Sequence, residues 1–108
     1  MTYVFDIDGT ICSKTDGDYT QAKPFHDRIK KVNRLYDEGH MIIFLTARGM
    51  GRHNNNFLNA QRDFYDLTLA QLKHWGAKYH QLFLGKPSGD YYIDDKGIND
   101  EDFFNTGN

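Results

Sequence analysis

The amino-acid sequence predicts an α/β fold in which helices flank a parallel β-sheet. Short apolar runs alternate with stretches of helical periodicity along the 108 residues, which is typical of a sheet with covering helices. Polar or charged residues follow each apolar run, and ligands of such sheets bind at the carboxyl ends of the strands. This length suits one core rather than two, so we expect a single Rossmann-like domain over residues 1–108.

The strands are expected where apolar residues follow one another without a break. Runs of this kind are typical of parallel strands that are buried on both faces. Each run ends at a glycine, an acid or a Thr-Ala-Arg segment, which sets the expected strand ends. The four runs cover residues 3–7, 41–45, 79–84 and 91–93.

The helices are expected where apolar residues recur at helical spacing. The first begins near Pro24 and ends at Gly39, because proline suits a first helical turn and glycine suits a C-terminal cap. A longer helix ends near Gly76, and a short one is expected over residues 98–104. The polar stretches expected to form loops are residues 8–23 and 49–56.

The composition disfavours several classes of protein. A formal net charge of -2 provides no global basic field, so nucleic acid is not an expected partner. The single cysteine, Cys12, cannot form an intrachain disulfide and fits a reducing compartment. No apolar stretch approaches the roughly 20 residues that cross a bilayer, and no signal-peptide pattern is visible. We therefore expect a soluble cytoplasmic protein without a membrane partner.

The acidic turn after the first expected strand indicates phosphate chemistry. Hydrolysis of a phosphate monoester needs a nucleophile, an acid for the leaving oxygen and compensation for phosphate charge. Asp6 is placed to attack the phosphorus and form an aspartyl phosphate. Asp8 is placed to protonate the leaving alkoxide and then to deprotonate the attacking water. Gly9 lets the backbone come close to the phosphate.

The ends of the second and third expected strands supply groups for the phosphate itself. Lys86 would neutralise charge on the phosphoryl group. The hydroxyl of Thr46 and the backbone amides near Ala47 would hold phosphate oxygens. Arg48 follows directly and is a further candidate for contact with the substrate.

A divalent cation is expected beside the acidic turn. Neighbouring carboxylates repel one another and the incoming phosphate, and Mg²⁺ relieves both repulsions. Mg²⁺ prefers oxygen ligands in octahedral geometry. The expected protein ligands are the carboxylate of Asp6, the backbone carbonyl of Asp8 and Asp95.

These residues resemble the four motifs of the haloacid dehalogenase-like (HAD) phosphatase superfamily. The resemblance implies the roles given above for Asp6 and Asp8, and phosphate binding by the threonine and lysine. It also implies Mg²⁺ binding by the last acids, directly by Asp95 and through water by Asp94. Family members that dehalogenate lack the acid at the position of Asp8, so phosphatase activity is implied. The matching motifs, in the family's order, are Asp6-Ile7-Asp8-Gly9-Thr10, Thr46, Lys86 and Asp94-Asp95.

A narrower resemblance concerns the small members of the superfamily that lack a cap domain. The chain leaves no room for an inserted cap, because about fifteen residues follow Asp8 before the first helix. The stretches Leu-Thr-Ala-Arg-Gly, Gly-Lys-Pro and Tyr-Ile-Asp-Asp-Lys look most like capless phosphatases of capsule and surface-polysaccharide synthesis. This resemblance implies a small phosphosugar substrate and an open site, which a second subunit in a homo-oligomer would cover.

Two other functions and several residue roles stay open at this level. One alternative is removal of terminal phosphates from nucleotides or nucleic-acid ends. The other is a catalytically idle subunit that binds phosphosugars, because a fold can persist without its activity. Arg52 and His53 flank the site and are candidates for substrate contact. The spacing from Asp95 to Asp100 also resembles a variant of the family's last motif, which makes Asp100 a second candidate for the last metal ligand.

Overall fold

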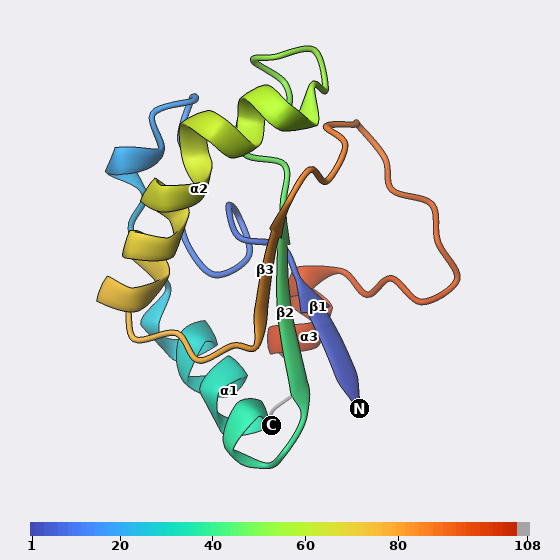
Figure 1. The fold of residues 1–108 in the computed structure, drawn as a ribbon. Coiled ribbons are helices and arrows are strands. Elements are labelled where there is room, and N and C mark those ends of the chain that lie inside the picture. The colour runs from blue at the N-terminus through green and yellow to red at the C-terminus, as the bar shows by residue number, and fades with distance from the viewer. Residues whose placement is uncertain (106–108) are drawn as a thin grey trace.

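The computed structural model describes residues 1–105 and contains one parallel three-stranded sheet. Its strands are β1 (Thr2–Phe5), β2 (Met41–Thr46) and β3 (Gln81–Leu84), and they lie in the order β1-β2-β3 (Figure 1). Phe5 pairs with Phe44 in β2, and Phe44 pairs with Leu82 in β3. The carboxyl ends of all three strands therefore meet at one edge of the sheet.

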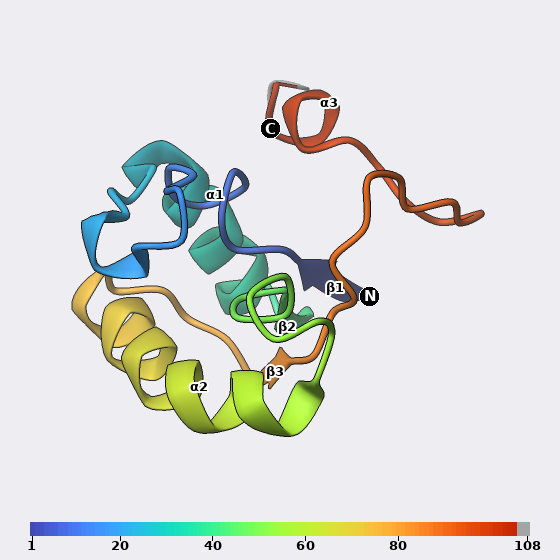
Figure 2. The ribbon, with the colours of Figure 1, turned by 90° about the horizontal axis from the view of Figure 1, so that it is seen from above.

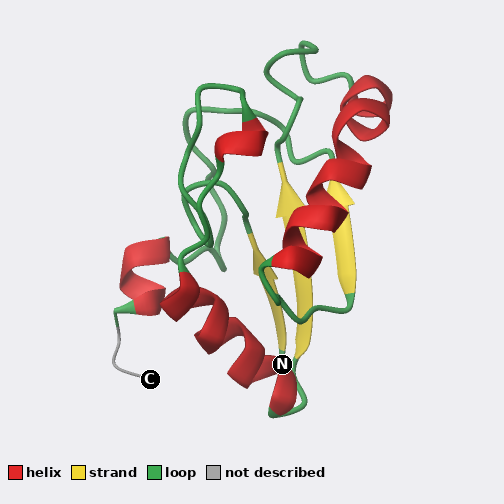
Figure 3. Ribbon diagram, turned by 90° about the vertical axis from the view of Figure 1, so that its left-hand side faces the viewer, coloured by secondary structure: helices red, strands yellow, loops and turns green. Residues whose placement is uncertain are grey.

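The helices connect the strands and lie on one side of the sheet. Helix α1 (His26–Asp37) connects β1 to β2, and helix α2 (Phe57–His74) connects β2 to β3. Figures 2 and 3 show both helices on the same face, and the short helix α3 (Asp100–Phe104) lies beyond β1. Within the loop after β1, one 3₁₀ turn, η1, spans Tyr19–Gln21. None of the helices described is long and apolar enough to cross a membrane.

The alternation of side chains along the strands separates a covered face from an open one. Phe5, Ile42, Phe44, Leu82 and Leu84 form the sheet's contribution to the core. On the opposite face, Val4 is 58% exposed and Phe83 is 49% exposed. Parallel sheets usually have both faces covered. In the described part of the chain, by contrast, only one face of this sheet is covered.

The expected fourth strand over residues 91–93 is wrong. These residues lie in a long loop, with Tyr91 and Ile93 86% and 98% exposed, and β1 pairs with β2 alone among the described strands. Pairing with the free edge of β1 would bring Asp94 and Asp95 toward Asp6, and carboxylates brought together without a cation repel one another. A strand of three residues would form only a few hydrogen bonds with β1, too few to offset that repulsion.

The other expected elements are confirmed, with shifts at their ends. The first strand ends at Phe5 rather than at residue 7, because Ile7 already belongs to the acidic turn. The first helix begins at His26, two residues after Pro24, and Phe25 is its N-cap with 38% exposure. The expected loop 8–23 holds the short turn η1.

Candidate active site

The acidic turn at the end of β1 is closed by its own backbone. The amides of Thr10 and Ile11 both donate to the carbonyl of Ile7, at 3.0 and 2.9 Å. Gly9 has a φ of +79°, a conformation that side chains other than glycine's rarely adopt, and its amide donates to the carbonyl of Cys12 at 2.8 Å. This closed turn holds the backbone on either side of Asp8 in place.

Asp6 lies half-buried at the start of this turn. Its Oδ1 accepts a hydrogen bond from the Ile7 amide at 2.8 Å, and its Oδ2 lies 3.6 Å from Lys86 Nζ. Burial raises the pKa of Asp6 above its ordinary value, and the charge of Asp8 adds to this rise; Lys86 and the Ile7 amide oppose it. An ionised carboxylate here is poorly solvated, and a cation or a proton stabilises it.

Lys86 reaches Asp6 from the end of β3. Its amide donates to the carbonyl of Thr46 at 3.2 Å, which ties the loop after β3 to the end of β2. The preceding Gly85 has a φ of +101°, and a Cβ there would lie 2.5 Å from the ring of Phe57. The Lys86 ammonium also lies 4.2 Å from the centre of the Tyr92 ring.

Thr46 and Arg48, at the end of β2, lie inside the protein. Thr46 is 1% exposed, and its hydroxyl oxygen accepts from the Arg48 amide at 3.2 Å. The Arg48 side chain is fully buried and binds both carboxylate oxygens of Asp8, at 2.9 and 3.0 Å. Arg48 was expected to contact the substrate, but its guanidinium faces Asp8 and the interior. Ala47 lies between them in the chain, at the end of the strand.

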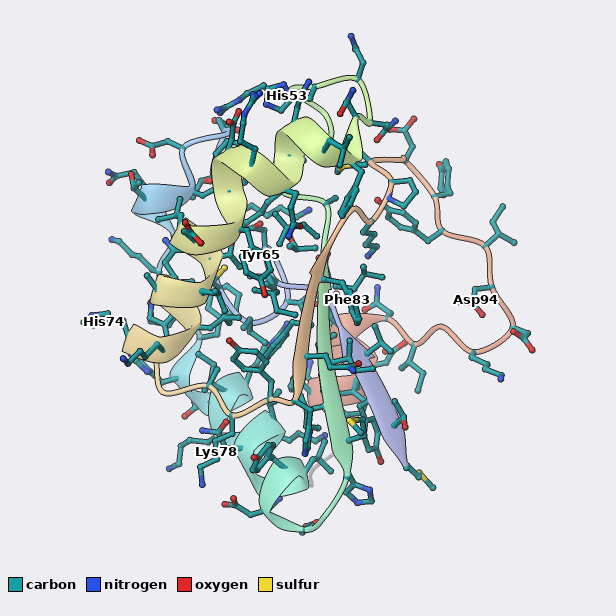
Figure 4. The ribbon with its side chains drawn as sticks, in the orientation of Figure 1. His53, Tyr65, His74, Lys78, Phe83 and Asp94 are labelled. Carbon is teal, nitrogen blue, oxygen red and sulfur yellow. The ribbon has the colours of Figure 1, made fainter. Side chains whose placement is uncertain are left out.

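The loop after β2 carries the two other flanking candidates. Arg52 donates to the carbonyl of Gly17 at 2.7 Å and so connects this loop to the loop after β1. His53 lies 2.9 Å from Asp63 in α2, and Figure 4 shows it at the outer end of the molecule. Both side chains already have partners within the protein.

The acids expected to complete a metal site lie apart from Asp6. Figure 4 shows Asp94 on the long loop that projects away from the sheet, and its carboxylate accepts from the Lys96 amide at 2.7 Å. That hydrogen bond is the main cause that holds the pKa of Asp94 below its usual value. Asp94 and Asp95 are both exposed, and Asp100 pairs with Arg28 at 2.7 Å. Among the described residues, no three His, Cys, Asp or Glu side chains form a cluster suited to a metal.

Three residues around Arg48 were not anticipated from the sequence. Thr68 Oγ1 and Gln71 Oε1 accept from Arg48 Nη1 at 3.2 and 2.5 Å, and the guanidinium carbon lies 4.9 Å from the centre of the Tyr19 ring. One signal was present, because Thr68 lies four residues from Phe64 and from Leu72 on a helix. A threonine in the middle of a buried apolar stripe indicates a buried polar partner.

The site thus brings together two carboxylates, an ammonium and a set of strand-end backbone groups. Asp6 has the Lys86 ammonium beside one carboxylate oxygen, and the other oxygen accepts from the Ile7 amide. Asp8 is 21% exposed and fixed by a guanidinium. A partly solvated carboxylate pair with an adjacent lysine is suited to nucleophilic attack and proton transfer at an anionic substrate.

Comparison with known proteins gives likeness in structure but none in sequence. No protein-family model matches the chain, and no curated protein matches it significantly. The crystal structure of an MCSG target from Vibrio cholerae is similar over 96% of this chain and 87% of its own, with a TM-score of 0.88 and 24% identity.

A second similar structure is a D,D-heptose 1.7-bisphosphate phosphatase from B. bronchiseptica, complexed with magnesium and phosphate. Its TM-score is 0.54 at 17% identity, and the match covers 90% of this chain and 53% of that one. Between the strands of the described residues there is no inserted cap domain. The described residues therefore have a HAD-like α/β fold, with a parallel three-stranded sheet flanked by helices and without a cap.

Proposed function

We propose that this protein is a Mg²⁺-dependent phosphomonoesterase that acts through an aspartyl phosphate on Asp6. The observation that carries the proposal is the convergence of Asp6, Asp8 and Lys86 at the carboxyl ends of β1 and β3. Asp6 Oδ2 lies 3.6 Å from the ammonium nitrogen of Lys86. Asp8 follows two residues later, in a turn that is closed by backbone hydrogen bonds. The likeness in fold to a phosphatase supports the same reading.

Each carboxylate has one task in the first half-reaction. The Asp6 carboxylate attacks phosphorus, and a bond from its oxygen to phosphorus forms while the ester bond breaks. Asp8 gives its proton to the departing alkoxide, which leaves as an alcohol. Lys86 stabilises the negative charge that spreads over the phosphoryl oxygens.

The second half-reaction restores both carboxylates. Asp8 takes a proton from a water molecule, the water oxygen bonds to phosphorus, and the bond to Asp6 breaks. Inorganic phosphate is released, and Asp8 carries the proton needed for the next cycle. Thr46 and the backbone amide of Ala47 lie at the strand end where the phosphate would be held.

The oxygen donors of the acidic turn suit Mg²⁺, although the set is incomplete in this arrangement. The carboxylate of Asp6 and the backbone carbonyl of Asp8 would be two ligands, and bound Mg²⁺ would neutralise phosphate charge. Asp95 would supply the third, with Asp94 behind it. For this, residues 91–93 would move from their exposed loop to the free edge of β1, which their apolar side chains favour.

A small phosphosugar, used in polysaccharide precursor synthesis, is the substrate class that we propose. The neighbour from B. bronchiseptica is a phosphatase of a heptose bisphosphate, which supports a sugar phosphate. The absence of a cap in the described chain leaves the approach to Asp6 open to a polar ligand.

Hydrolysis assays test the proposal. Purified protein would be incubated with an aryl phosphate, a panel of sugar phosphates and a nucleotide, with Mg²⁺ or with chelator. We expect turnover that chelator abolishes and that Asp6→Asn reduces by at least about a thousandfold. Asp90→Asn, on the exposed loop, is the matched control and should keep full activity. Turnover that survives both chelator and Asp6→Asn would refute the mechanism, and binding of sugar phosphates without turnover would identify a binding subunit.

A further inference from the structure

Arg48 is the one charged residue among the buried residues of the described chain. Its side chain is 0% exposed, whereas the partner Asp8 is 21% exposed. Removing a guanidinium from water is unfavourable, and the cost is offset only where its donors are paired. The contacts of Arg48 show how its donors are paired and which group they hold.

All five N–H groups of the Arg48 guanidinium face acceptors. Nε and Nη2 bind the two oxygens of Asp8 at 2.9 and 3.0 Å, in the parallel geometry that arginine makes with a carboxylate. Nη1 donates to Thr68 Oγ1 and to Gln71 Oε1. The second Nη2 hydrogen faces the sulfur of Cys12 at 4.0 Å. No donor is left for a phosphate ligand.

The same guanidinium is fixed from the other side by the loop after β1. The Tyr19 ring lies over it at 4.9 Å, and the Tyr19 hydroxyl accepts from the Gly49 amide at 2.9 Å. Gln71 Nε2 donates to the Tyr19 carbonyl at 2.7 Å. Arg48 therefore joins β2, α2 and this loop in one network that ends on the Asp8 carboxylate.

We propose that Arg48 is a positioning residue for Asp8 and does not bind substrate. The paired donors fix the rotation of the Asp8 carboxyl group, so that its proton is delivered and recovered at one place in the site. This inference rests on the proposed phosphatase function. Orientation of a reacting group is worth up to about a hundredfold in rate for a misplacement near 1 Å.

The test separates positioning from substrate binding by the two kinetic constants. Arg48→Lys keeps the charge but loses the paired geometry, so kcat should fall by about tenfold to a hundredfold. KM should stay within about twofold, because no substrate contact is removed. Arg62→Lys is the matched control, since Arg62 is 67% exposed on α2 and pairs with Asp63; it should leave both constants unchanged. Added guanidinium should restore part of kcat to Arg48→Ala.

The opposite pattern would overturn the inference. A raised KM at unchanged kcat would make Arg48 a substrate ligand, and no change in either constant would deny it any role. If Arg48→Lys melts below the assay temperature, Gln71→Leu provides the second variant, because it removes one partner of Nη1 and leaves the Asp8 pair. Gln71→Leu should lower kcat measurably but by less than about tenfold, again at unchanged KM, and an unchanged kcat would count against the network.

A spectroscopic measurement keeps this inference distinct from the proposed function. If the wild-type protein hydrolyses no phosphate ester, the proposed function fails, whereas the orientation of Asp8 can still be measured. The side-chain ¹³C resonance of Asp8, assigned through Asp8→Asn, should shift or broaden in Arg48→Lys and stay in place in Arg62→Lys. An Asp8 resonance that is the same in all three folded proteins would refute the positioning role.

Discussion

At the scale of single residues, the site places charge where water solvates it poorly. Asp6 is half-buried, and its pKa is raised chiefly by that burial. The folded protein therefore holds the Asp6 proton more tightly than the unfolded chain does. The free energy of unfolding therefore falls as the pH rises from the ordinary pKa of an aspartate to the raised pKa of Asp6 in the folded protein. In this range Asp6 ionises more easily in the unfolded chain.

Asp6→Asn should therefore stabilise the metal-free protein. Asparagine keeps an acceptor for the Ile7 amide and removes the poorly solvated charge. We expect a higher melting temperature than wild type at pH 7 and a smaller difference as the pH falls toward that ordinary value, measured by circular dichroism with chelator present. Asp90→Asn should leave the melting temperature unchanged. An Asp6→Asn protein that melts below wild type at pH 7 would contradict this prediction.

The buried thiol of Cys12 should react slowly with alkylating reagents. Burial, followed by the charge of Asp8, raises the pKa of Cys12 from 9.0 to about 12. Only the thiolate reacts with alkylating reagents, so the folded protein at pH 8 should react about a thousandfold more slowly than the unfolded chain. Mass spectrometry of iodoacetamide adducts, with and without urea, measures this ratio. Equal rates would show that the Cys12 thiol is open to solvent.

At the scale of elements, the start of α2 depends on one asparagine. Asn56 is the N-cap of α2, and its side chain accepts from the Asn59 amide at 3.0 Å. Asn56→Ala should lower the free energy of unfolding by about 1 kcal/mol, as measured by urea denaturation. The matched control is Asn54→Gly, because Asn54 has a φ of 52° and glycine adopts that conformation freely. Equal losses in both variants would deny the cap its role.

Most elements could be predicted because each carries its own local pattern. Continuous apolar residues marked β2, and helical spacing marked α1 and α2. The run 91–93 has the same apolar character, but a strand also needs a partner edge, and that pairing depends on charges elsewhere in the chain. Local patterns do not contain this information, so the fourth strand was expected where the structure has a loop.

The candidate site was predictable to the extent that strand ends converge. Asp6, Asp8, Thr46 and Lys86 follow apolar runs, and a parallel sheet brings such ends together. The orientation of Arg48 was not predictable in the same way. Its direction follows from Thr68 and Gln71 on α2, more than twenty positions beyond the strand, and from the loop after β1.

At the scale of the whole molecule, the long loop after β3 is the part that must move for the proposed metal site to form. Asp95 should bind Mg²⁺ once residues 91–93 pair with β1, whereas Asp90 precedes that segment. Asp95→Asn should therefore weaken Mg²⁺ binding by about tenfold or more, measured by calorimetry, and Asp90→Asn should not. The backbone amides of β1 should also exchange hydrogen more slowly when Mg²⁺ and phosphate are present. Equal Mg²⁺ affinity in both variants would refute this closure.

The free edge of β1 has a consequence for behaviour in concentrated solution. Sheet edges usually carry a charge or a proline that prevents two copies from pairing edge to edge. The segment Thr2–Phe5 has neither, and Val4 on the open face is 58% exposed. We expect that metal-free protein aggregates through this edge as its concentration rises. If Mg²⁺ binding causes residues 91–93 to pair with β1, the edge is covered. Mg²⁺ would then act as a cofactor and would also keep the protein soluble.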